Sequence, residues 1–108
     1  MGKKIAKMLN VKFRTVREIR MGSPYNLCEI EFEGEWIPPL PTYDWQDLKA
    51  QSPDKRYLAL VQWNTFGNVP GFHVVRIDVK NRRIHKTRRI LGICKKIYWD
   101  KDKFVWVK

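Results

Sequence analysis

The chain has 108 residues and a formal net charge of +11, with 44% hydrophobic and 13% aromatic residues. This length suffices for one domain with a modest core, and the apolar content is too high for a disordered chain. No run approaches the ~20 apolar residues of a membrane span, and residues 1–10 lack the apolar segment of a signal peptide. We therefore expect a single domain over residues 1–108 in the reducing cytoplasm, with no membrane association.

The first third of the chain predicts two paired strands. Residues 1–10 have the character of a frayed basic N-terminus. Residues 11–21 alternate apolar and basic side chains, and residues 27–33 alternate an apolar row with a row of glutamates. If the two strands pair antiparallel, the glutamates face the basic row and neutralise part of it. That pairing argues against a binding site on residues 12–20.

The next stretch predicts a connector and a short helix. Pro38 to Pro41 cannot form a central strand, because proline lacks the backbone donor. We interpret it as an extended connector, with docking to an aromatic-grooved partner protein as the alternative. Residues 44–50 are predicted to form a short helix with Asp44 as its N-cap, which Pro53 ends.

The most apolar part of the chain predicts a central hairpin. Residues 57–63 are apolar on both faces, as expected for a strand covered on both sides. Gly and Pro punctuate residues 64–71, and residues 72–79 alternate as a second strand.

This hairpin also carries a resemblance. Ser52-Pro53-Asp54-Lys55-Arg56-Tyr57-Leu58-Ala59 resembles the Ser-Pro-Asp-Gly-Lys/Arg-Tyr-Leu-Ala stretch of a TolB-type β-propeller blade, and residues 74–79 are similar to a later blade strand. The resemblance covers about residues 48–90 and implies a local β-meander, with no implication for partners or sites. Lys55 stands where the blade pattern has glycine. A propeller array needs roughly three or more repeats, so the single copy here excludes a monomeric propeller.

The last third predicts an edge strand and a closing hairpin. Residues 83–90 are polar on both faces, which favours an exposed edge strand. Residues 93–99 and 104–107 are predicted as strands joined by a polar turn at residues 100–103. The whole pattern predicts an all-β fold in one small antiparallel domain, either a meander barrel or two packed sheets. We expect about five to seven strands and at most one short helix.

Catalytic and metal-binding signatures are missing from the sequence. Cys28, Cys94, His73 and His85 lack the spacing of a structural zinc site, and the two cysteines are expected to be free thiols. No arrangement predicts a nucleophile with its base, or a phosphate-binding glycine loop. We expect no enzyme activity, no catalytic residues, no metal and no cofactor.

Charge is the best functional indication. Eight basic residues and no acidic ones lie between Val79 and Trp99, whereas residues 27–54 are strongly acidic. The leading hypothesis is a non-catalytic module that binds a polyanion, with RNA or DNA as partner through its phosphate backbone. The predicted nucleic-acid-binding residues are Arg82, Arg83, Lys86, Arg88, Arg89, Lys95, Lys96, Tyr98 and Trp99. The alternative is a protein-interaction or structural domain that meets its partner through exposed tryptophans or the Pro38 to Pro41 connector, with the charge serving solubility only.

Overall fold

The computed structural model of the chain describes residues 9–18 and 26–108, which form nine strands and no helix. The strands are β1 (Asn10–Glu18), β2 (Asn26–Glu33), β3 (Trp45–Gln51), β4 (Tyr57–Trp63), β5 (Gly71–Asp78), β6 (Arg83–Lys86), β7 (Ile90–Leu91), β8 (Lys96–Asp100) and β9 (Lys103–Val107). Seven of them form one antiparallel sheet in the order β1 to β6, with β7 also paired to β5, and β8 and β9 form a separate two-stranded sheet. The predicted all-β fold is confirmed. The expected frayed terminus and the end of the first predicted strand fall largely on residues 1–8 and 19–21, outside the described residues.

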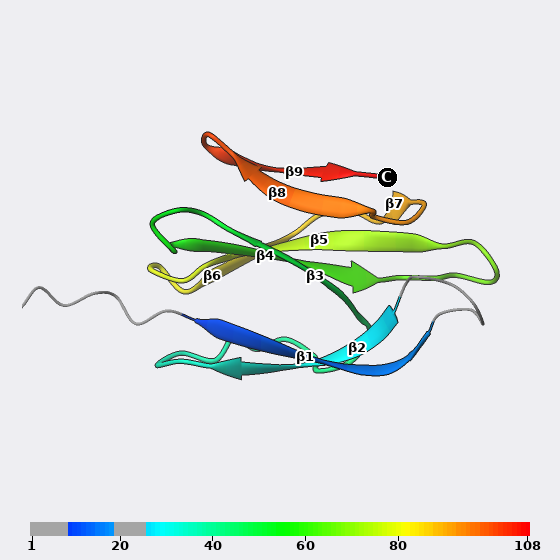
Figure 1. Ribbon diagram of the computed structural model, residues 1–108, viewed down its shortest axis with the longest axis horizontal. Helices are drawn as coiled ribbons and strands as arrows, with labels where there is room; N and C mark the ends of the chain where they lie inside the picture. The colour runs from blue at the N-terminus through cyan, green and yellow to red at the C-terminus, as the bar shows by residue number, and fades with distance from the viewer. Residues whose placement is uncertain (1–8, 19–25) are drawn as a thin grey trace, which may run out of the picture.

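The strands are arranged in three layers (Figure 1). β3 to β6 form the middle layer, the β1–β2 ribbon folds across one of its faces, and the β8–β9 hairpin covers the other. The middle layer is joined to the ribbon by a short stretch of pairing between β2 and β3, in which Cys28 lies opposite Trp45. This narrow junction allows the ribbon to turn under the sheet instead of continuing it.

The central pair β4–β5 confirms the predicted hairpin. Leu58 and Leu60 of β4 pack in the core against β1 and β2, whereas Ala59 and Val61 pack in the core under β8 and β9. All four side chains are buried, with at most 2% of their surface exposed. Because successive side chains of a strand point to opposite faces, only a strand between two layers can bury a continuous apolar run.

The outer ribbon pairs as the charge pattern predicted. β1 and β2 are antiparallel, with Arg14 opposite Glu29 and Lys12 opposite Glu31. Lys12 forms an ion pair with Glu33 at 2.9 Å, and Arg14 forms one with Glu29. The glutamate row therefore neutralises much of the basic row on the outer face of this layer.

The predicted helix over residues 44–50 is wrong. Trp45–Gln51 is strand β3, paired with β4, and Asp44 adopts φ +74°, which is not the conformation of a helix N-cap. The side chains of Trp45 and Gln46 are both buried, one facing each neighbouring layer. Tertiary burial thus overrides a weak local preference for helix.

The predicted edge strand over residues 83–90 is only partly right. β6 covers Arg83–Lys86 and lies at the edge of the sheet, but the pairing with β5 stops there and resumes at β7. Between β6 and β7, Thr87 forms two hydrogen bonds with Val74. The Thr87 backbone N–H donates to the Val74 carbonyl at 3.1 Å, and the Thr87 hydroxyl accepts from the Val74 N–H at 3.0 Å. The described residues form more strands than the predicted five to seven, because β7 is separate from β6 and β3 replaces the predicted helix.

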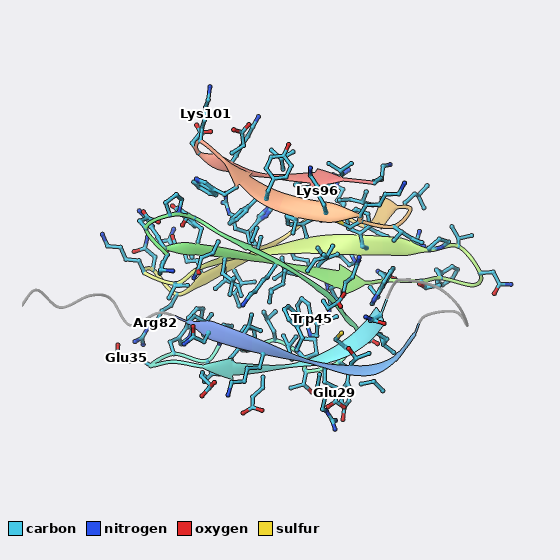
Figure 2. All side chains as sticks on the ribbon, in the orientation of Figure 1. Glu29, Glu35, Trp45, Arg82, Lys96 and Lys101 are labelled. Atoms are coloured by element: carbon cyan, nitrogen blue, oxygen red, sulfur yellow. The ribbon has the colours of Figure 1, made fainter. Side chains whose placement is uncertain are left out.

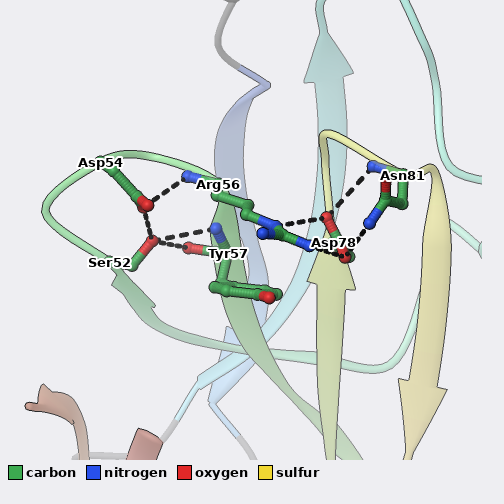
Figure 3. Close-up of polar contacts among 6 residues, drawn as sticks. All are labelled: Ser52, Asp54, Arg56, Tyr57, Asp78 and Asn81. Carbon is green, nitrogen blue, oxygen red and sulfur yellow. Dashed lines mark hydrogen bonds and ion pairs between the residues drawn. The ribbon is translucent and has the colours of Figure 1, made fainter. Parts of the chain in front are cut away.

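The turn before β4 is held by a polar network (Figure 3). Ser52 Oγ donates to Asp54 Oδ1 at 2.7 Å and accepts from the Tyr57 N–H at 2.9 Å. Arg56 then joins this turn to the end of β5, because its guanidinium donates to both oxygens of Asp78 at 3.3 Å. Lys55 adopts φ +64° in this turn, at the position where the blade pattern has glycine.

Candidate anion-binding site

The predicted binding residues do not share one surface. On β6, Ile84 packs into the core against the β1–β2 ribbon, so Lys86 lies on that side of the strand. Arg83 and His85 lie on the opposite side, toward β9. Arg88 is exposed beyond the end of β6. The basic cluster is therefore divided between two faces.

Two arginines of the cluster differ from the others in their surroundings. Arg89 is half-buried, and its guanidinium donates to the backbone carbonyls of Asn64 at 2.8 Å and Val69 at 2.7 Å. It lies so close to Gly71 that a Cβ added there would be 2.6 Å from its Nε. Arg82 lies at the β5–β6 turn and lines a small recess together with Glu35 (Figure 2). Arg89 thus holds the β4–β5 loop, and Arg82 has an acidic neighbour.

The two predicted stacking aromatics lie on opposite faces of the β8–β9 hairpin. Tyr98 points outward and is 40% exposed, with the Lys96 ammonium 5.1 Å from its ring centre. Trp99 points inward, where its ring stacks on Tyr57 at 5.9 Å between centres. Tyr98 and Trp99 cannot contact the same base. Lys95 and Lys96 are exposed at the start of this hairpin.

A cleft of about 210 Å³ opens between the middle layer and β9. Its lining residues are Val74, Arg76, His85, Thr87, Lys103, Phe104 and Trp106. Arg76 and His85 are register partners on β5 and β6, and Lys103 lies at the start of β9. Among the described residues that line the cleft, three carry basic side chains and none carries a carboxylate.

The cleft walls are held in place by packing and hydrogen bonds. Phe104 meets the Trp99 ring edge-on at 4.9 Å, which connects it through Trp99 to Tyr57 of the middle layer. The Arg76 guanidinium lies 5.6 Å from the centre of the Tyr57 ring. Contacts of this kind reduce the freedom of both side chains before any ligand binds.

The cleft was not predicted from the sequence. None of the residues that line the cleft was among the predicted binding residues. Side chains alternate between the two faces of a strand, so the sequence predicts only that some of these residues face solvent. No sequence signal indicates that β9 lies beside the β5–β6 edge.

Charge is distributed unevenly between the layers. Glu29 lies on the outer face of the β1–β2 ribbon, whereas Lys96 and Lys101 lie on the β8–β9 hairpin at the opposite side of the molecule (Figure 2). Near the cleft, the closest acidic groups along the chain are Asp78, which accepts hydrogen bonds from Arg56 and Asn81, and the turn residues Asp100 and Asp102. Both turn acids are neighbours of Lys101 or Lys103 in the sequence.

The cysteines and histidines occupy separate places. Cys28 and Cys94 are free, as expected from the sequence. Both are fully buried, and they lie in two different cores. Burial raises the pKa of both thiols. His73 Nδ1 lies 2.8 Å from the Thr87 carbonyl and its Nε2 lies 2.7 Å from the Asn64 amide, so its ring is fully engaged. Within the described residues, no group of three or more His, Cys, Asp or Glu side chains is placed to hold a metal.

Comparison of the chain with models of protein families, with curated proteins and with solved structures finds no match. Within the part of the chain that the structure describes, there is also no helix long and apolar enough to cross a membrane. The class of protein that the fold and cleft define is a small all-β domain with a basic, aromatic-walled surface cleft.

Proposed function

We propose that this protein is a non-catalytic module that binds a polyanion, RNA or DNA, through its phosphate backbone. The observation that carries the proposal is the cleft beside β9, which has Arg76, His85 and Lys103 among its lining residues. Arginine and lysine neutralise phosphates and release condensed counterions, which supplies most of the affinity of sequence-independent binding. Charge bias supports the same function, since the chain has 22 Lys and Arg against 11 Asp and Glu.

The binding surface proposed here extends from the cleft along β6. Arg83 lies on the same side of β6 as His85, and the exposed Arg88 follows the strand. This arrangement retains part of the predicted basic cluster and adds Arg76 and Lys103 to it. Arg89 is better understood as a structural residue, because its donors are used by two carbonyls.

Salt dependence tests the proposal. Binding of labelled oligonucleotides is measured by fluorescence anisotropy over several salt concentrations. The double variant Arg76→Gln with Lys103→Gln should weaken binding and reduce the magnitude of the log K against log[salt] slope by about two, since each phosphate contact contributes about one unit. Lys12→Gln is the matched control, because it removes a positive charge that Glu33 already neutralises on the outer face of the ribbon.

A second double variant tests the part of the cluster predicted from sequence. Lys86→Ala with Arg88→Ala should flatten the slope by roughly two units if both residues contact phosphate. If it does so while Arg76→Gln with Lys103→Gln has no effect, the phosphate path runs past Lys86 and Arg88 and does not enter the cleft. If the wild-type protein binds neither RNA nor DNA at tens-of-micromolar concentration near physiological salt, the function is wrong, because non-specific binders reach a Kd of ~10⁻⁴–10⁻⁶ M there.

Protein interaction is the second candidate function, and one observation favours it. Phe66 is 79% exposed and Val69 is 53% exposed at the tip of the β4–β5 loop. Exposed apolar side chains that lie close together are typical of contact surfaces. The tryptophans give weaker support for a protein contact, because Trp45 and Trp63 are buried and Trp106 is only 37% exposed. An interaction through the loop tip would be nearly insensitive to salt, which separates it from phosphate binding.

A further inference from the structure

We propose that the cleft between the β5–β6 edge and β9 takes one unstacked nucleobase together with its phosphate, so that the protein binds single strands in preference to duplexes. This inference rests on the proposed function and names the ligand of the same site. It is based on the combination of aromatic walls and basic rim in one small space.

The size and walls of the cleft fit a planar ring. Its volume of about 210 Å³ lies below the ~300–1,000 Å³ of sites for drug-sized ligands. Val74 is buried at its base, and Phe104 and Trp106 contribute aromatic surface. Such walls favour a single ring system over a folded cofactor or a bare phosphate chain.

Trp106 is the side chain best placed to stack on a base. It is 37% exposed, and its register partner across the hairpin is Ile97, which packs in the core, so the strand turns the indole toward the cleft side. Among the described residues, no hydrogen bond or ring stacking involves the Trp106 side chain. Phe104, by contrast, is already held edge-on by Trp99.

The polar groups of the cleft fit the remainder of a nucleotide. Arg76 and Lys103 supply cations for a phosphate. The Thr87 hydroxyl accepts a hydrogen bond from Val74, which leaves its own hydrogen to donate to a phosphate or a base carbonyl. His85 adds a ring nitrogen on the same rim.

Access to this cleft distinguishes single strands from duplexes. Bases in a duplex are stacked and paired, and an aromatic side chain reaches their flat faces only after unstacking. In a single strand the base is available, and stacking on an aromatic side chain is tolerant of sequence. The phosphate contacts alone provide no such preference, because both forms carry them.

The experiment compares three fluorescein-labelled probes of equal length at one moderate salt concentration: oligo(dT), oligo(U) and a mixed-sequence DNA duplex. We expect both single strands to bind at least ~10-fold more tightly than the duplex. Trp106→Leu should weaken single-strand binding ~5- to 150-fold and abolish the preference, since one stacked base contributes that much affinity. The salt slope should not change, because no charge is removed.

Tyr98→Leu is the matched control, since it removes a similarly exposed aromatic ring from the outward face of the same hairpin. It should leave the preference unchanged. If it removes the preference while Trp106→Leu does not, bases stack on the outward face and the inference is wrong. Trp106→Phe retains a ring and should keep most of the preference, and far-UV circular dichroism checks the folding of each variant.

The two proposals fail in different ways. If no probe binds at tens-of-micromolar protein, the proposed function itself is wrong. If single strands and duplex bind equally, with steep salt dependence and no effect of Trp106→Leu, phosphate binding stands and the base-binding cleft is refuted. Equal binding of single strands and duplex by the wild-type protein is by itself enough to refute the base-binding cleft.

Discussion

Truncation of Ile77 to alanine should destabilise the protein by ~2–5 kcal/mol. Ile77 is 0% exposed, and it packs in the core between the middle layer and the β1–β2 ribbon. Its register partners on the two adjacent strands are Leu58 and Ile84. The change removes about three buried carbon groups at ~0.8 kcal/mol each, or about 2.4 kcal/mol, and the residual cavity adds to this loss.

Urea unfolding measures the effect as a fall in the midpoint with an unchanged m-value. Leu91→Ala is the control, because Leu91 is 59% exposed and its truncation should change stability by less than ~0.5 kcal/mol. A loss below ~1 kcal/mol for Ile77→Ala would refute the assignment of this side chain to a close-packed core.

The three-layer arrangement can be tested with a second site. Val61 is also 0% exposed but packs in the other core, beneath the β8–β9 hairpin. Val61→Ala should be destabilising by itself, and its effect should add to that of Ile77→Ala within ~0.5 kcal/mol because the two side chains share no core. A coupling energy well above that value would indicate one continuous core instead of two.

Three further predictions concern the turns and the titratable groups. Lys55→Gly should leave the melting temperature unchanged or raise it. Glycine relieves the ~1–2 kcal/mol cost of the left-handed conformation of Lys55, which offsets the ~0.4–1 kcal/mol that its greater freedom in the unfolded chain costs. A fall of several degrees would contradict this prediction. Cys28 and Cys94 should not react with a thiol reagent in the native protein, since burial raises the pKa of both, and reaction of either within minutes would show that its core opens readily. Burial acts to raise the pKa of Asp78, but hydrogen bonds from Arg56 and Asn81 outweigh it and lower the pKa below the usual value of an aspartate. The ionised carboxylate therefore stabilises the folded protein above the unfolded pKa of ~3.9, and this stabilisation is lost as pH falls through the pKa of the folded state. Asp78→Asn should reduce the loss of unfolding free energy at acidic pH. If the variant and the wild-type protein lose stability in parallel as pH falls, the prediction is wrong.

The sequence by itself determined the elements whose signal is local. The apolar run of β4 indicated burial on both faces, because a strand with alternating side chains can bury every residue only between two layers. The glutamate row of β2 and the basic row of β1 indicated an antiparallel pair with charges on its outer face, since opposite charges favour that register. Turn residues located the β8–β9 hairpin for the same local reason.

The tertiary structure alone decided which strands and side chains are neighbours. The segment over residues 44–50 became a strand because β4 offered it backbone partners and two cores to enter, which a local helical preference cannot anticipate. The basic cluster was divided between two faces because a four-residue strand and the break at Thr87 point its side chains in different directions. The cleft exists only because β9 lies over the β5–β6 edge, and the distance in sequence between Arg76 and Lys103 carries no signal of that contact.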